Sequence, residues 1–428
     1  MEQEAMRPKV LMSAYACEPC RGSEPGVGWN WAMSMSRHVD VTVITRSNNR
    51  PVIEGWFREQ RADTRWAPPE FIYHDPPRIM LFAKQRKLLP VQAFYLVWQI
   101  GVSLLMRKKL KDFDLVHHVT FNSMMSPGFW WARSTPVILG PLGGTSCVAR
   151  EYKALYGRAI WKENLRGWLI RNWSMLPWLR MSFRRAACIL CANSETEAYL
   201  AARYPEKTNR LLETGVMASE VEAEVTDRSR AEDSMRIIWV GAIEPWKALG
   251  IAVRAFGQAR AELSNECDLQ IDIVGTGSGL EKARSEVAAL GLEQNVTFHG
   301  ALPLEETRAR MRTADLMVFS SIKDTSGNVV LEAMSMSKPV VCINHQGAGD
   351  MTTDRTAIRV SPGTLQETVD GMAAGIVKLA RDANLRHVLG RHGRERILEE
   401  YTWEKKAIKM KEIYQRVIGR SKRCQNKA

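Results

Sequence analysis

Short apolar runs alternate along the chain with segments of helical periodicity, a pattern typical of α/β proteins. The chain opens with an apolar strand at Lys9–Tyr15 and a glycine-rich loop at Gly22–Gly28, followed by a helical segment at Trp29–Arg37 and an alternating strand at Val39–Thr45. This order predicts a parallel sheet with right-handed crossovers. Further strands of this half are predicted at Leu115–Val119, Val137–Leu139 and Ala187–Ala192.

A second start of the same kind follows, with a strand at Arg236–Val240, a loop at Gly241–Pro245 and a helix from Lys247 to Arg260. Later strands are predicted at Leu269–Val274, Val296–His299, Leu316–Ser320 and Pro339–Ile343. Two successive α/β units of roughly 200 residues each predict two Rossmann-like domains facing each other across a cleft. We expect domains at 1–215 and 216–400, a join near 215–235, and a basic C-terminal helix at 401–428.

Composition is ordinary for a globular protein, with 45% hydrophobic and 25% charged residues, and excludes a disordered or fibrous chain. Charge is uneven: residues 1–190 hold 27 basic against 14 acidic residues, 191–400 hold 24 against 31, and 401–428 hold 9 against 2. Eleven of the 14 Trp also fall in the first 190 residues. The two halves are therefore expected to face different partners, one of them anionic and partly apolar.

The N-terminus at Met1–Pro8 is polar and lacks the features of a signal peptide, and the apolar stretch Val91–Met106 is interrupted by polar residues. We therefore expect a cytoplasmic protein. Two CxxC pairs, Cys17/Cys20 and Cys188/Cys191, lie too far apart in sequence for a zinc-finger spacing. No metal site is predicted, and ordinary reduced cysteines are favoured.

The most informative segment runs from Asp324 to Met334 and leads from an apolar strand into a helix predicted at Asn328–Ser337. Gly327 allows close backbone approach, and the amides of Asn328 and Val329 would face a diphosphate at the positive end of the helix. Glu332, one turn inside, could accept hydrogen bonds from ribose hydroxyls, and Asp324 from a sugar. The alternative is a capped surface helix with incidental acids.

Two further segments follow predicted strands. Lys247 ends the loop that starts at Gly241, and a lysine at a helix start opposes the dipole, which favours a phosphate ligand. Gly275 and Gly277 form a glycine-rich turn that lacks the full dinucleotide-binding spacing and is weak by itself. The turn Phe298–Leu302 comes next.

In order and spacing, these pieces resemble the nucleotide-binding domain of retaining GT-B glycosyltransferases of glycosyltransferase family four. The pattern G-R-x-x-x-x-K, V-G-x-G, x-F-x-G and E-x7-E-A is met by Gly241…Lys247, Gly275/Gly277, Phe298/Gly300 and Asp324…Glu332-Ala333. With the N-terminal glycine loop and the length, the resemblance covers nearly the whole chain. Two positions depart from it, because Asp324 replaces the family's first Glu and Ala242 replaces an Arg.

The resemblance implies a GT-B enzyme of polysaccharide biosynthesis that moves a sugar, with retention and without a metal, from a UDP- or GDP-sugar to a glycan or lipid-linked glycan. It implies that the domain at 1–215 binds the acceptor and the domain at 216–400 binds the nucleotide sugar. It also implies that the helix at 401–428 crosses back to the first domain. It implies that Lys247 neutralises the departing diphosphate and Asp324 binds the donor sugar. It further implies donor contacts at Glu332, Gly327, Asn328, Val329, Gly241, Gly275, Phe298, Gly300 and Leu302. No cofactor is expected, because the nucleotide sugar is a substrate.

In the first half, His117 and His118 end a strand at the predicted cleft, and the resemblance implies that one of them contacts the donor sugar. The register is ambiguous; His118 is favoured, and a purely structural histidine is the alternative. Glu24, Gly26 and Gly28 belong to the loop that the resemblance places over phosphates and acceptor. Gly140–Gly144 is a second loop at the cleft rim.

Basic and aromatic residues interleave between Arg150 and Arg185, and basic residues flank the apolar stretch within Lys84–Lys111. Both patterns are typical of helices that lie on anionic membranes, and indicate peripheral association at the inner face of the plasma membrane. A helical insertion that buries its own Trp residues (Trp161, Trp168, Trp173 and Trp178) is the alternative.

Other functions weighed were a non-catalytic nucleotide-sugar binding protein, a GT-B sugar epimerase and a nucleic-acid module, for which no motif is present.

Overall fold

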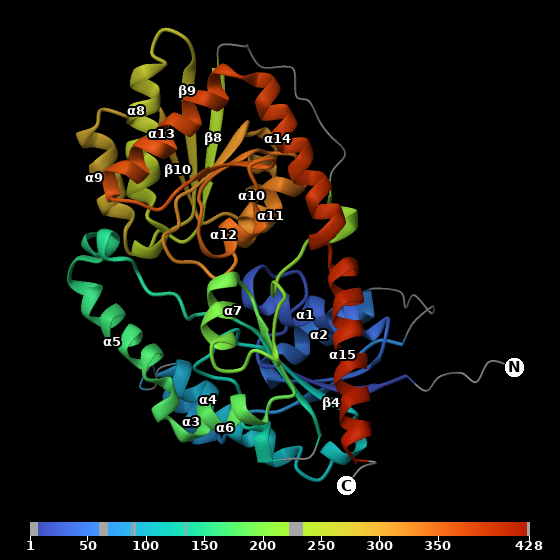
Figure 1. Cartoon of the computed structure of the whole chain (residues 1–428). Helices are drawn as coiled ribbons and strands as arrows, with labels where there is room; N and C mark the ends of the chain where they lie inside the picture. The colour runs from blue at the N-terminus through green and yellow to red at the C-terminus, as the bar shows by residue number, and fades with distance from the viewer. Residues whose placement is uncertain are drawn as a thin grey trace, which may run out of the picture. The chain divides into compact units, whose positions relative to one another are not determined.

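A computed structural model describes residues 7–59, 67–86, 88, 91–132, 135–221 and 234–425 (Figure 1). The chain forms two compact units. The first comprises Met1–Thr145, Leu169–Glu213 and Trp403–Ala428, and the second comprises Ser146–Trp168 and Thr214–Thr402. The predicted join overlaps residues 222–233, which lie outside the described residues.

The first unit is built on a seven-stranded parallel sheet with the strand order β3-β2-β1-β4-β5-β6-β7. All six residues of β4 are buried, because helices cover both faces of a parallel sheet. The chain reverses its direction of strand addition between β1 and β4, the position where α/β sheets bind ligands. The strands are β1 (Lys9–Ala14), β2 (Asp40–Thr45), β3 (Glu70–Tyr73), β4 (Leu115–Thr120), β5 (Val137–Leu142), β6 (Cys188–Cys191) and β7 (Thr208–Arg210).

Helices of the first unit pack around an aromatic core that includes Phe94, Trp98 and Phe183. The longest of them is α15, drawn in red in Figure 1, which starts at Trp403. The hydroxyl of its Tyr414 lies 2.6 Å from Nδ1 of His117 in β4. The helices are α1 (Ser23–Ser36), α2 (Arg50–Glu59), α3 (Arg78–Gln85), α4 (Val91–Leu105), α6 (Pro177–Arg185), α7 (Ser194–Ala201) and α15 (Trp403–Gln425); α5 (Ile160–Arg171) runs across the boundary between the units.

The glycine-rich segment predicted as a loop over Gly22–Gly28 is instead the start of α1, which begins at Ser23. A Cβ on Gly26 would lie 2.0 Å from the Arg21 carbonyl oxygen, and one on Gly28 would lie 2.1 Å from that of Ala16. These glycines are therefore needed because the first turns of α1 press against the preceding backbone. The helical period was misread there because glycine gives no apolar signal.

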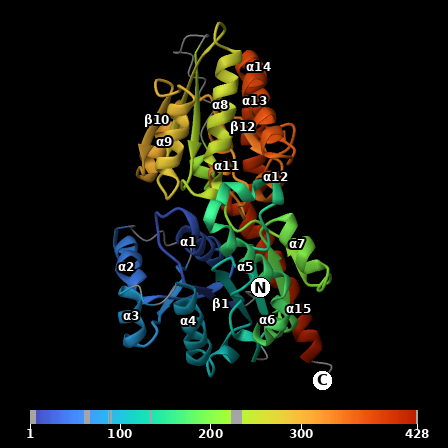
Figure 2. The same ribbon diagram turned by 90° about the vertical axis from the view of Figure 1, so that its left-hand side faces the viewer.

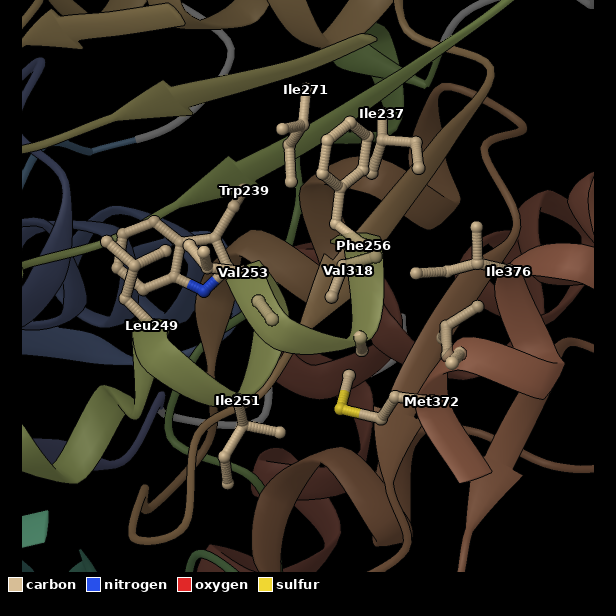
Figure 3. Close-up of a cluster of buried hydrophobic side chains, with 14 of the residues drawn as sticks. Ile237, Trp239, Leu249, Ile251, Val253, Phe256, Ile271, Val318, Met372 and Ile376 are labelled. Atoms are coloured by element: carbon tan, nitrogen blue, oxygen red, sulfur yellow. The ribbon is translucent and has the colours of Figure 1, made fainter. Parts of the chain in front are cut away.

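The second unit has a six-stranded parallel sheet with the order β10-β9-β8-β11-β12-β13. Its core gathers around Trp239, Phe256 and Ile271, where α8 packs on the sheet (Figure 3). The strands are β8 (Ser234–Val240), β9 (Asp268–Val274), β10 (Val296–Gly300), β11 (Leu316–Phe319), β12 (Val340–Ile343) and β13 (Ala357–Val360); the helices are α8 (Leu249–Glu262), α9 (Leu280–Ala289), α10 (Leu304–Thr313), α11 (Asn328–Ser335), α12 (Gln346–Met351), α13 (Leu365–Arg381) and α14 (Ala383–Arg396) (Figure 2).

One segment differs from the predicted domain at 1–215: residues 146–168, between β5 and β6, belong to the second unit. They carry 3₁₀ turns at Arg150–Ala159 and the first part of α5. Tyr152 and Tyr156 are buried in the core of the second unit, and the Tyr152 hydroxyl lies 2.8 Å from Oγ1 of Thr368. Burial of these aromatic rings explains why the segment packs there.

The two Rossmann-like α/β domains predicted from the sequence are thus confirmed. Within the described residues, no helix has both the length and the apolar character needed to cross a bilayer. Over the same part of the chain, no cluster of three or more His, Cys, Asp or Glu side chains is arranged to hold a metal ion.

Candidate functional site

Three loops leave the carboxyl ends of β8, β9 and β10 and pack backbone against backbone. The Gly241 amide donates to the Val274 carbonyl at 3.0 Å, and the Gly275 amide donates to the Gly300 carbonyl at 2.7 Å. Gly275 has φ +140°, and a Cβ there would lie 1.8 Å from the Gly241 oxygen. Only glycine fits at position 275, so the predicted Gly241, Gly275 and Gly300 are brought together.

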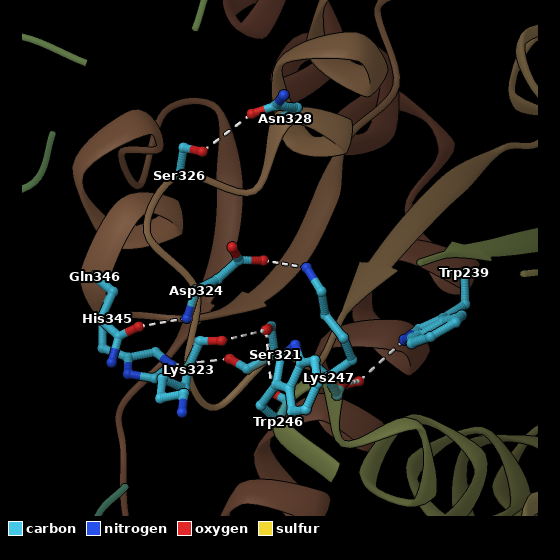
Figure 4. A network of polar contacts seen from close by, with 11 residues as sticks. Trp239, Trp246, Lys247, Ser321, Lys323, Asp324, Ser326, Asn328, His345 and Gln346 are labelled. Carbon is cyan, nitrogen blue, oxygen red and sulfur yellow. Dashed lines mark hydrogen bonds and ion pairs between the residues drawn. The ribbon is translucent and has the colours of Figure 1, made fainter. Parts of the chain in front are cut away.

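Lys247 and Asp324, predicted separately, form an ion pair (Figure 4). Their side chains are 18% and 21% exposed. Lys247 follows β8 and Asp324 follows β11, the adjacent strands between which the order of this sheet reverses. The pair therefore stands at the edge where α/β sheets bind ligands.

A network of hydrogen bonds fixes the loops that carry this pair. Ser320 Oγ donates to the Lys247 carbonyl at 3.0 Å and accepts from Trp239 Nε1 at 3.1 Å. The Ile322 amide donates to the Trp246 carbonyl at 2.9 Å. The Asp324 amide donates to Gln346 Oε1 at 2.5 Å. Both side chains of the ion pair are thus held on anchored backbone (Figure 4).

The helix α11 begins directly beyond Asp324. Gly327, with φ +72°, precedes it, and a Cβ there would lie 2.7 Å from the ring of Phe319. Asn328 and Val329 are its first two residues, whose amides have no partner inside a helix. This end of α11 therefore offers N–H donors and positive potential to an anion next to the cation of Lys247.

Glu332, on the same helix, lines a cavity of about 260 Å³. The pKa of its carboxyl is raised, mainly by burial. The charge of Arg308 acts to lower this pKa, and that of Glu220 acts to raise it. Arg308 pairs with Glu220 at 3.1 Å. Sequence reasoning missed Arg308 and Arg312, although their spacing of four on a helix could have indicated a shared face. The cavity is lined by Gly215, Val216, Ser219, Glu220, Arg308, Arg312, Glu332, Ser335 and Met336.

The turn predicted to meet a base lies at the end of β10, outside the lining of this cavity. Phe298, Gly300 and Leu302 are half-buried, and the Arg284 guanidinium lies 5.7 Å from the Phe298 ring centre. Their role stays a prediction.

In the first unit, both His117 and His118 are fully buried within β4. His117 Nδ1 lies 2.6 Å from the Tyr414 hydroxyl and Nε2 lies 2.7 Å from the Gly140 carbonyl. His118 Nε2 lies 3.0 Å from the Tyr95 hydroxyl. Burial lowers the pKa of both rings to about 4, so both are neutral near pH 7. The predicted contact of His118 with substrate stays untested, and every partner named here is structural.

Glu24 lies at the reversal of strand order in the first sheet. Its Oε1 accepts from the Asn122 amide at 3.1 Å, and its Oε2 is buried with no hydrogen-bond partner among the described residues. Burial raises the pKa of Glu24 to about 7. The hydrogen bond from Asn122 acts to lower this pKa, and the charge of Glu213 acts to raise it. Asn122 Nδ2 also donates to Glu213 Oε1 at 3.2 Å. Sequence reasoning missed Asn122 and Glu213, which no motif marks.

Comparison with known proteins finds similarity to glycosyltransferases. Residues 234–382 match the family described as Glycosyl transferases group 1. An uncharacterized glycosyltransferase of Methanocaldococcus jannaschii is 22% identical over 56% of this chain and 61% of its own length. The GDP-mannose-dependent alpha-(1-6)-phosphatidylinositol monomannoside mannosyltransferase of Mycolicibacterium smegmatis is 24% identical over 66% of this chain and 75% of its own.

Among solved structures, Anabaena HepE in complex with UDP aligns with a TM-score of 0.61 at 14% identity, over 95% of this chain and 99% of that one. This similarity extends the GT-B architecture over both units, while the family match covers the unit that carries Lys247, Asp324 and Glu332. The chain thus has the GT-B fold, and its residues 234–382 match the group 1 glycosyltransferases.

Proposed function

We propose that the protein transfers a sugar, with retention, from a nucleoside diphosphate sugar to a glycan or lipid-linked glycan. The observation that carries this proposal is the Lys247–Asp324 ion pair, at the reversal of strand order in the second sheet and shortly before α11. Glu332, further along α11, lines a cavity. The ammonium of Lys247 and the α11 amides would stabilise the charge on the departing diphosphate. Asp324 would accept hydrogen bonds from the donor sugar, and Glu332 from the ribose.

Chemistry of this site also supports a reaction that needs no metal, because a cation and a helix end supply the positive charge at the leaving group. The relative from Mycolicibacterium smegmatis is named as GDP-mannose-dependent, and HepE holds UDP. Both classes of donor are therefore candidates. Ala242, which stands where the family pattern has Arg, leaves Lys247 as the cation that the pattern places in this loop.

The donor is tested with a thermal-shift panel of UDP-, GDP- and ADP-sugars against wild type and Glu332→Ala. A ligand at about 100 times its Kd stabilises by about 2.7 kcal/mol. One nucleotide class should shift wild type and fail to shift the variant. No shift with any of them would refute the donor site.

Catalysis is tested by product analysis with the donor that this panel selects. Lys247→Ala should lose turnover by at least about 10²-fold, as expected when a preorganised charge at a leaving group is removed. Lys378→Ala, on the exposed face of α13, is the matched control. Activity of Lys247→Ala near the wild-type rate would contradict the proposal. Binding without transfer or hydrolysis would identify a binding protein, and an altered free sugar an epimerase.

We further propose that the acceptor lies at an anionic membrane surface. In the first unit, α3 and α4 expose Ile79 (77%) and Leu104 (61%), with the exposed bases Arg107, Lys108 and Lys109 just beyond α4. In the second unit, Trp161, Leu165 and Trp168 share one exposed face of α5. Apolar faces flanked by bases are typical of helices that bind anionic lipid.

One of the predicted surface tryptophans is not on the surface. Trp173 is buried in the core of the first unit, where its ring centre lies 4.9 Å from that of Phe183. Its spacing resembled that of its exposed neighbours because the apolar period of a basic helix does not tell which side faces the protein.

Membrane association is tested by co-sedimentation with anionic and neutral vesicles. Wild type should bind anionic vesicles alone, and the double variant Trp161→Ala/Trp168→Ala should bind them more weakly. Leu290→Ala, at an exposed position beyond α9, is the control. Binding to neither kind of vesicle would end this part of the proposal.

A further inference from the structure

Glu163, on α5, is bonded to the residue that precedes Asp324. Its Oε2 lies 2.6 Å from Nζ of Lys323, and the two side chains are 9% and 20% exposed. Glu163 belongs to the segment 146–168 that packs on the second unit, so the contact lies within one compact unit. A segment far away in the sequence thus reaches the loop that carries the predicted sugar-binding carboxylate.

The charge of Glu163 is held in place by a second partner. Arg166 Nη2 lies 2.6 Å from Glu163 Oε1, and the same nitrogen donates to the Ser146 carbonyl. Burial acts to raise the pKa of the Glu163 carboxyl, but the hydrogen bonds from Arg166 and Lys323 outweigh it and leave that pKa below its usual value. The Glu163 carboxylate is therefore ionised, and its two oxygens are held in place by Arg166 and Lys323.

Two aromatic rings also lie near the Lys323 ammonium. Its Nζ lies 5.9 Å from the ring centre of Tyr156 and 6.0 Å from that of Trp246. Burial lowers the pKa of Lys323, whereas the hydrogen bond that its ammonium donates to Glu163 raises it. Glu163 is the carboxylate that compensates this ammonium.

Two lysines therefore flank Asp324 in different ways. Lys247 comes from the loop after β8 and pairs with Asp324, whereas Lys323 is its neighbour in sequence and pairs with Glu163. If Glu163 lost its charge, the ammonium of Lys323 would be left half-buried without a counter-ion, which is unfavourable. Asp324, the next residue in the sequence, would then be a candidate counter-ion for Lys323.

We propose that Glu163 is a positioning residue for the donor site: it draws Lys323 away from Asp324, so that the Asp324 carboxylate stays available to Lys247 and to the donor sugar. This inference rests on the proposed function of Asp324. It predicts a selective defect, because Asp324 would contact the sugar while the α11 amides and Lys247 would contact the diphosphate.

The test measures, by calorimetry, the Kd of the nucleotide sugar chosen by the donor panel and of the matching nucleoside diphosphate. Glu163→Gln should weaken binding of the nucleotide sugar by roughly tenfold, in line with the cost of misplacing a binding group, and leave the nucleoside diphosphate unchanged. Lys323→Gln should bind both ligands as wild type does. The double variant Glu163→Gln/Lys323→Gln should regain the wild-type Kd, because the competing ammonium is gone.

Three results would overturn the inference: unchanged binding in Glu163→Gln, equal weakening of both ligands, or a double variant as weak as Glu163→Gln. If Glu163→Gln does not fold, Glu163→Asp withdraws the charge by one methylene. It should weaken nucleotide-sugar binding by a smaller factor that Lys323→Gln restores, and no effect would again overturn the inference. A wild type that binds no nucleotide sugar instead refutes the proposed function.

Discussion

Replacing Glu24 by Gln should make the first unit more stable at alkaline pH and leave its stability in acid little changed. Glu24 has a buried Oε2 without a hydrogen-bond partner among the described residues, and burial raises the pKa of its carboxyl from 4.5 to about 7. The folded protein therefore favours the protonated carboxyl, which the amide of Gln resembles in shape and charge. The variant keeps the packing and removes the titration.

The size of the effect follows from the two pKa values. Below pH 4.5 the carboxyl is protonated in both the folded and the unfolded chain. As the pH rises to about 7 the unfolded chain ionises first, so wild type loses stability, and above that the loss is complete. Each pKa unit corresponds to about 1.4 kcal/mol, so the interval corresponds to about 3 kcal/mol. For a unit of this size that is roughly 6–12 °C in the unfolding midpoint.

Thermal unfolding of wild type and Glu24→Gln from pH 4 to pH 8.5 measures this directly. The midpoint of the variant minus that of wild type should grow across the range and level off above neutral pH. Glu206→Gln, at an exposed position of the same unit, controls for the loss of a surface charge. A difference that stays constant with pH, or that shrinks, would refute the burial argument for Glu24.

Two other substitutions have definite outcomes. Gly275→Ala should lower the free energy of unfolding in urea by at least about 3 kcal/mol, because φ is +140° there and the new Cβ would lie 1.8 Å from the Gly241 oxygen. Gly419→Ala, which has open space around it, should not lower it, and equal midpoints for the two variants would contradict the close approach. Trp31→Phe should lower the free energy of unfolding by about 1–3 kcal/mol, because it removes the 2.9 Å hydrogen bond to the Glu213 carbonyl and weakens the edge contact with Trp403. A change below about 0.5 kcal/mol would show that these contacts contribute little.

The strands that could be predicted from the sequence are those whose apolar runs are long enough to stand out. The strands β3, β7 and β13 were missed, and all three lie at sheet edges. β7 has only three residues, none of them buried, and β3 has no buried residue either. Edge strands are short and half-solvated, so neither an apolar run nor a clean alternation marks them.

The sequence could place Lys247 and Asp324 at one edge of the second sheet, because loops after parallel strands end at the same edge. The pairing of Lys247 with Asp324 could not be predicted in this way, because it depends on β8 and β11 being neighbours. The local pattern of apolar residues does not determine strand order. The contact of Glu163 with Lys323 was still harder to predict from the sequence. It requires residues 146–168 to leave the sheet in which the chain before and after them lies.

Both sheets place polar groups where their strand order reverses, yet the two sites differ in charge balance. In the second unit, Lys247 meets Asp324, and Lys323 is compensated by Glu163, so each carboxylate has a cation. In the first unit, Glu24 accepts from the amide of Asn122 and lies near the carboxyl of Glu213. No cation of the described residues pairs with Glu24, and its pKa rises to about 7. A site that binds a dianionic diphosphate needs cations held in place before the ligand arrives. The second unit thus holds cations at its reversal of strand order, as a diphosphate site requires, whereas burial in the first unit disfavours the charge of Glu24.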